Sequence, residues 1–154
     1  MWKILNVFTG LRSKALHVTP RELGFVPVAG APQVFGVVTD WSLDNGVATI
    51  TAFVTGDASL YLSSGGGVIG GIEHENVRLA AKSVIDIAAT CLELLKPTTG
   101  FPLPAAGCTR FSVLSIGINH CAECATIDLT ERKHALSPLF FAVQELIGQL
   151  RLTK

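Results

Sequence analysis

An alternating pattern of apolar and polar residues in the first half of the chain constrains the fold more than any other feature. Residues 34–43 are rich in β-forming side chains, residues 44–46 (Asp-Asn-Gly) are a strong hairpin signal, and residues 47–55 alternate again. Residues 56–57 (Gly-Asp) mark a second tight turn, so residues 58–63 are expected to return as a third antiparallel strand. The sequence therefore predicts a three-strand meander.

A long helix is predicted next, over residues 73–96. One apolar face persists along its length, which is typical of a helix that packs against a core, and this face consists of Val77, Ala80, Ala81, Val84, Ala88, Cys91, Leu92 and Leu95. Leu79, Ile87 and Leu94 lie off that face and form a second apolar stripe. A further element, such as a partner subunit, is expected to cover this stripe.

The rest of the chain predicts two more strands and a closing helix. Residues 109–117 and 121–129 read as strands around a turn at residues 118–120. Ser137 is expected to cap a helix with Pro138 at its first position, and that helix runs to about residue 152. The fold class that follows is α+β, with a single antiparallel sheet of about five strands, a long central helix and a C-terminal helix packed on it, and a short N-terminal helix.

The chain is expected to form a single domain over residues 1–154, with an N-terminal helix and irregular arm in residues 1–33 and the core in residues 34–154. In the arm, Ile4, Phe8, Leu11 and Ala15 recur at helical spacing, which indicates a short amphipathic helix. We expect this helix to dock on the domain. Contact with a membrane surface through its aromatic residues and cations is the alternative.

The order of these elements resembles the profilin-like folds and, more loosely, the roadblock family of dynein-associated light chains and GTPase regulators. The roadblock order has two strands before the middle helix and three after it, whereas three and two are predicted here. The resemblance implies a small dimeric interaction module. It is carried by no motif, so it assigns no functional residue.

Composition narrows the classes of partner. Hydrophobic residues make up 49% of the chain and charged residues 16%, with a mean hydropathy of +0.47, which suggests that a partner subunit covers part of the surface. We therefore expect a homodimer. The twelve basic and twelve acidic residues cancel, which argues against nucleic acid as a partner.

No apolar run is long enough for a transmembrane segment, and the N-terminus lacks the order of a secretory signal, so a cytoplasmic location with reduced cysteines is expected.

A glycine-rich segment joins the third predicted strand to the long helix. Residues 65–70 satisfy G-x-G-x-x-G, but the acidic residue that a dinucleotide site needs about 20 residues later would fall inside the helix, near Asp86. The simplest interpretation of this segment is a turn with a structural role only. The alternative is a site for an anion or small ligand, formed by Ser63, Ser64, Gly65, Gly66 and Gly67 together with His74 and Glu75 at the helix start.

Four residues around the last predicted hairpin have the chemistry of zinc ligands: Cys108, His120, Cys121 and Cys124. On a strand, residues three apart point to opposite faces, so Cys121 and Cys124 would not meet on one metal ion. We therefore expect structural thiols, with no metal and no cofactor.

Two functions remain open from the sequence. The first is a small non-enzymatic homodimeric binding, scaffold or regulatory domain, which contacts its partner copy or another protein through the second helix stripe or an exposed strand edge. The alternative is a small-ligand or enzyme domain with its site at the glycine turn, although an enzyme is the less expected outcome.

Overall fold

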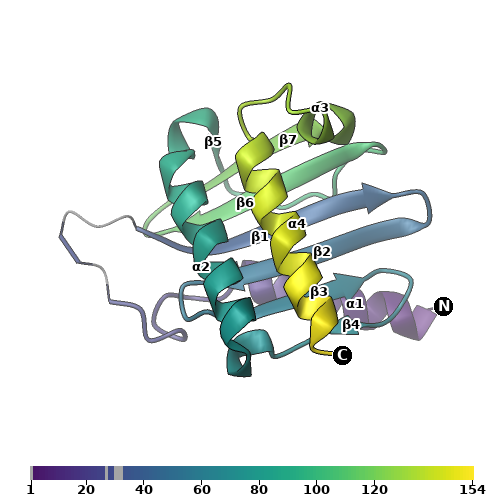
Figure 1. Ribbon diagram of the computed structural model, residues 1–154, viewed down its shortest axis with the longest axis horizontal. Helices are drawn as coiled ribbons and strands as arrows, with labels where there is room; N and C mark the ends of the chain where they lie inside the picture. Colours follow the sequence, from purple (N-terminus) through teal and green to yellow (C-terminus); the bar gives the residue numbers. More distant parts are fainter. Residues whose placement is uncertain (1, 27, 30–32) are drawn as a thin grey trace.

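The computed structural model describes residues 2–26, 28–29 and 33–154 (Figure 1). In chain order the helices and strands are α1 (Trp2–Leu16), β1 (Val34–Leu43), β2 (Gly46–Phe53), β3 (Ala58–Leu62), β4 (Gly67–Val68), η1 (Gly71–Glu73), α2 (Glu75–Thr90), η2 (Leu92–Leu94), β5 (Lys96–Thr98), β6 (Cys108–Ser115), β7 (Asn119–Ala125), α3 (Thr126–Thr130) and α4 (Ser137–Leu152). The η elements are short 3₁₀ helices. Among the described residues, no helix has the length and apolar character needed to cross a bilayer.

The strands form one antiparallel sheet with the order β4-β3-β2-β1-β6-β7-β5. The chain builds one half of the sheet as a meander from the central strand β1 out to the edge strand β4. Helix α2 then crosses the sheet and delivers the chain to β5, the opposite edge, after which β6 returns to pair with β1. Strands that are far apart in sequence thus meet at the centre of the sheet.

Helices α2 and α4 lie side by side across one face of the sheet (Figure 1), and they contact each other extensively. The main core lies between these helices and the sheet. Its largest fully buried side chains include Phe111 from β6, Ile50 from β2, and Leu139 and Leu146 from α4. Burial of a side chain of this size stabilises the fold by roughly 1.5–3 kcal/mol.

Helix α1 lies on the other face of the sheet, behind it in Figure 1. Ala15 and Leu16 from its last turn join a second apolar cluster with Val38, Phe53 and Leu114 from the sheet. The N-terminal helix predicted from the sequence is therefore present and docked. Two faces of one sheet are covered by different parts of the chain.

The predicted fold class is confirmed, and so are the meander and the apolar face of the central helix. The last residue pair between β1 and β2 is Leu43 with Gly46, at the expected position of the Asp-Asn-Gly turn. The sheet has seven strands rather than about five, because β4 and β5 are short edge strands that no sequence pattern marked. With four strands before α2 and three after it, the likeness to profilin-like folds stays a prediction.

The predicted long helix ends earlier than expected, at Thr90 instead of residue 96. The residues after it form η2 and then β5, in which Lys96 pairs with Cys121. Lys96 precedes Pro97, and a residue before proline is pushed out of the helical region into extended backbone. Proline also lacks the N–H group that an interior strand would need, so it suits this edge position.

The strand predicted over residues 121–129 is wrong at both ends. Strand β7 begins at Asn119 and stops at Ala125, opposite Cys108, the first residue of β6. Beyond that point there is no partner strand, and the chain turns into the short helix α3. The expected turn accordingly moves to residues 116–118.

Ser137 does not cap helix α4. It is the first helical residue, it is buried, and its hydroxyl has no hydrogen-bond partner. The side chain of His134 supports the turn just before the helix, because its Nδ1 accepts a hydrogen bond from the backbone N–H of Leu136 at 3.0 Å. His134 is therefore a half-buried structural residue of the loop before α4.

The glycine-rich segment folds back on β3 and makes a backbone turn that other residues would strain. Gly65, Gly66, Gly67 and Gly70 all have positive φ angles, between 76° and 150°. A Cβ atom at Gly67 would lie inside the van der Waals envelope of the carbonyl oxygen of Leu60. The structural role predicted for this turn is confirmed.

We predict that Gly67→Ala destabilises the protein by about 1–3 kcal/mol or more, because it adds both a positive-φ penalty and a backbone clash. The matched control is Gly100→Ala, where a Cβ meets no atom within 4 Å and φ is not positive. Chemical denaturation of both variants measures the difference. Equal stability of the two variants would contradict this account of the turn.

Candidate functional site

The structure separates the residues of the predicted ligand site. The amide of Gly65 donates to the carbonyl of Leu62, and the amide of Leu62 donates to the carbonyl of Gly66, so part of the turn's backbone is already paired. The Ser63 hydroxyl accepts the N–H of Val47 at 2.8 Å and closes the end of β2. Ser64 is exposed at the tip of the turn. These bonds hold the β3–β4 hairpin together.

His74 and Glu75 begin helix α2 and are both exposed. They line a hollow of about 470 Å³ together with Glu73 and Gln149, which we call the α2 hollow, and none of residues 63–67 reaches it. Two carboxylates line this hollow and no lysine or arginine does. Its charge therefore disfavours an anion. That the turn or these two side chains bind a ligand stays a prediction.

The four candidate zinc ligands do not converge. Alternation along β7 places His120 and Cys124 on one face and Cys121 on the other, as the register with β6 requires. Cys108 starts β6 opposite Ala125, and His120 Nδ1 lies 3.2 Å from the Ser115 hydroxyl. Among the residues that the structure describes, no group of three or more His, Cys, Asp and Glu side chains is arranged to hold a metal ion.

Cys124 has an altered acidity. The pKa of its thiol is raised from 9.0 to about 11, mainly by burial and to a smaller extent by the negative charge of Cys108, Asp128 and Glu123. Its Sγ lies 3.9 Å from Nδ1 of His134, in the loop before α4. A thiol that stays protonated is a poor nucleophile and a poor metal ligand. The Cys124 side chain therefore packs as a structural residue near the start of α4.

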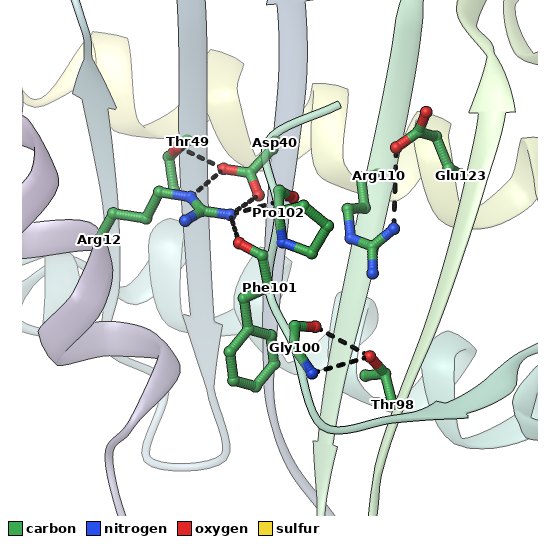
Figure 2. Close-up of polar contacts among 9 residues, drawn as sticks. All are labelled: Arg12, Asp40, Thr49, Thr98, Gly100, Phe101, Pro102, Arg110 and Glu123. Atoms are coloured by element: carbon green, nitrogen blue, oxygen red, sulfur yellow. Dashed lines mark hydrogen bonds and ion pairs between the residues drawn. The ribbon is translucent and has the colours of Figure 1, made fainter. Parts of the chain in front are cut away.

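A buried ion pair fixes helix α1 to the sheet (Figure 2). Arg12 donates through Nε and Nη2 to the two carboxylate oxygens of Asp40, at 2.9 and 2.8 Å, and Asp40 is fully buried in the central strand β1. The Thr49 hydroxyl donates to the same carboxylate at 2.6 Å. Arg12 Nη2 also donates to the carbonyl of Phe101 at 2.9 Å. One guanidinium thus joins α1, the sheet and the β5–β6 loop.

A second charged pair lies next to the first in the same row of the sheet. Asp40 faces Arg110 across β1 and β6, and Arg110 faces Glu123 across β6 and β7. Figure 2 shows the Arg110 guanidinium directed toward Glu123, with Nη1 to Oε1 at 3.7 Å. The amide of Ala105 donates to the other oxygen of Glu123 at 3.3 Å, which holds the same loop. Among the described residues, the buried Nε of Arg110 has no hydrogen-bond partner, although its Nη1 lies near Glu123.

The most enclosed apolar hollow among those described lies beneath the C-terminal half of α4, and we call it the α4 pocket. Its volume is about 550 Å³. Ala48 and Leu60 are its most buried lining residues, and Arg151 and Lys154 stand exposed at its rim. The remaining lining residues are Trp41, Leu43, Leu62, Gly67, Val68 and Ile147.

The geometry of the α4 pocket matches that of small-molecule sites, which are largely apolar and carry a few polar groups that orient the ligand. Trp41 is held by a T-shaped contact with Phe140, with 6.2 Å between ring centroids. Sequence reasoning missed this site, because its lining comes from β1, β2, β3, β4 and α4. The sequence feature that could have indicated the pocket is the pair of cations, Arg151 and Lys154, at the end of an apolar helix.

Comparisons with protein-family models, curated proteins and solved structures found no match to this chain. Its function is therefore inferred from its own residues.

We predict that Arg12→Met destabilises the protein by about 3 kcal/mol, because it leaves the Asp40 carboxylate buried with Thr49 as its remaining side-chain donor. Adding Asp40→Asn to this variant should restore part of the loss, since the amide needs no counter-charge. Urea denaturation of both variants measures the effect. A double variant less stable than Arg12→Met would contradict the charge argument.

We predict that iodoacetamide at pH 8 modifies Cys124 more slowly than the half-buried Cys108 and Cys121, as followed by peptide mass spectrometry. Because folding raises the pKa, the contribution of Cys124 to stability is fully present below about pH 9 and is lost as the pH rises from about 9 to about 11. Cys124→Ala should remove this alkaline loss, whereas Cys121→Ala should keep it. Rapid labelling of Cys124 would show that its thiol is not held protonated.

Proposed function

We propose that the protein is a small non-enzymatic binding domain that acts as a homodimer through the outer surface of its helix layer. The observation that carries the proposal is the exposure of Leu79 on α2 and Leu94 on η2, which are 60% and 51% exposed. Both residues belong to the second apolar stripe, which was expected to be covered by a partner. Ile87, the third member, is half-buried and packs against the core.

The edges of the sheet support the same choice of interface. Strand addition needs a long, regular edge with free N–H and C=O groups. The edge strand β4 has two residues, and the edge strand β5 has three, of which Pro97 carries no N–H. Of the two interfaces that the sequence left open, the helix layer therefore suits a partner copy better than the strand edge.

The side chains that were candidates for catalysis support a non-enzymatic role. His74 and Glu75 line the α2 hollow, but both side chains are exposed to water. Cys124 keeps its proton at neutral pH because its pKa is raised to about 11. Catalytic groups usually lie in clefts that tune their pKa toward the working pH.

The test is the oligomeric state in solution. We predict that the wild-type protein sediments as a dimer, at twice 16.3 kDa, across the micromolar range. Leu79→Glu and Leu94→Glu should weaken the dimer, because each places a charge in an interface that has to bury roughly 1,000 Å² or more. Light scattering after gel filtration reports the mass directly.

Leu103→Glu is the matched control. Leu103 is 50% exposed, like Leu94, but it lies in the β5–β6 loop, away from the helix layer. Substitutions at exposed positions of this kind change stability by roughly 0.5 kcal/mol or less, so all three variants should stay folded. A monomeric wild-type protein, or a dimer dissociated by Leu103→Glu alone, would rule out this interface.

A further inference from the structure

We propose that the α4 pocket is a binding site for an amphipathic monocarboxylate, an unbranched acid whose hydrocarbon chain enters the pocket while its carboxylate meets Arg151 and Lys154. This goes beyond the proposed dimer, because the pocket lies beneath α4 and includes neither Leu79 nor Leu94.

The shape of the apolar part of the site depends on a small residue in its floor and on the larger apolar side chains around it. Ala48 on β2 contributes a single methyl group to the lining, where a larger side chain would fill the gap under α4. Leu60, Leu62, Val68 and Ile147 surround that space with hydrocarbon. A volume of about 550 Å³ is within the range of pockets that enclose drug-sized ligands, so a medium-length chain fits it.

The charged side chains that line the pocket are both cationic. Arg151 and Lys154 are exposed there, and no aspartate or glutamate lines the pocket. Within the described part of the chain, no side-chain carboxylate lies at ion-pair distance from either cation. A ligand with one carboxylate and a hydrocarbon chain matches both halves of the site. The α2 hollow, with two glutamates, has the opposite charge and serves as the internal contrast.

Arg151 has a second role that the test must separate. It lies in the last turn of α4, where a cation stabilises the negative end of the helix dipole. Loss of that role alone would lower the melting temperature of the free protein. It would not change the preference of the pocket for a carboxylate over an uncharged alcohol of the same chain length.

Trp41 provides a direct reporter of occupancy, because it lines the pocket. The chain has two tryptophans, so a Trp2→Phe background leaves Trp41 as the sole one. The probes are octanoate, decanoate and decanol, together with a decanoate brominated on its chain, all below their micelle-forming concentrations. Bromine quenches tryptophan fluorescence only in close contact.

We expect brominated decanoate to quench Trp41, and decanoate to bind about fifteenfold tighter than octanoate, because each of its two additional buried methylenes contributes about fourfold. Decanol should bind more weakly than decanoate. Arg151→Gln should weaken decanoate about threefold to tenfold and leave decanol unchanged. Lys82→Gln, which removes an exposed cation from α2, is the matched control and should change neither affinity.

Three results would overturn the proposal. The first is the absence of quenching by the brominated acid at saturating concentration in a folded protein. The second is equal affinity for decanoate and decanol that Arg151→Gln does not alter, which would leave an apolar hollow without carboxylate recognition. The third is a loss of Trp41 quenching by the brominated acid as the protein concentration rises. That result would show that a second copy of the chain occupies the pocket. Ile147→Phe, which fills the pocket from α4 without adding a second tryptophan, should abolish binding while the fold is retained.

Discussion

The buried carboxylate of Asp40 is the constraint from which the arrangement on one face of the sheet follows. Asp40 sits in the central strand β1 with no exposed surface, and an unpaired charge there would cost several kcal/mol. Arg12 and Thr49 satisfy it, and the Phe101 carbonyl accepts a further bond from Arg12. One carboxylate therefore fixes the position of α1 and of the β5–β6 loop. An apolar pair would hold them as firmly, but it would not select a single orientation.

Local patterns carried most of the fold that the sequence could predict. The Asp-Asn-Gly turn fixes a register through neighbouring residues, and the apolar face of α2 repeats at a spacing that only a helix keeps on one side. The glycine turn was likewise recognisable, because four of its glycines occupy backbone conformations that other residues rarely adopt. In each case the interacting groups are close in sequence. Such elements are specified before the chain has any tertiary structure.

Contacts distant in sequence account for what could not be predicted. β5 exists because Lys96 meets Cys121 across the sheet, and the pattern of the preceding helix gives no sign of that partner. Arg12 and Asp40 are 28 positions apart, and nothing in the amphipathic helix marks one cation as the buried one. The same reason explains why the residues of the expected ligand site lie in two separate places. Residues 63–67 and His74 are close in sequence, yet the chain crosses from the sheet edge to the helix layer between them.

The α4 pocket shows how a site can arise from the shape of the sheet rather than from a motif. Strands β3 and β4 shorten toward the sheet edge, to five and two residues, while the last turns of the 16-residue helix α4 extend over them. A larger side chain would narrow the resulting gap, but Ala48 contributes a single methyl group to its lining. Gly67 is the residue whose backbone excludes any Cβ, because Leu60 lies against it. Gly67 therefore keeps folded the hairpin that lines one side of the pocket, and because a Cβ there would point at the backbone of Leu60, Gly67→Ala tests the turn and not the apolar lining.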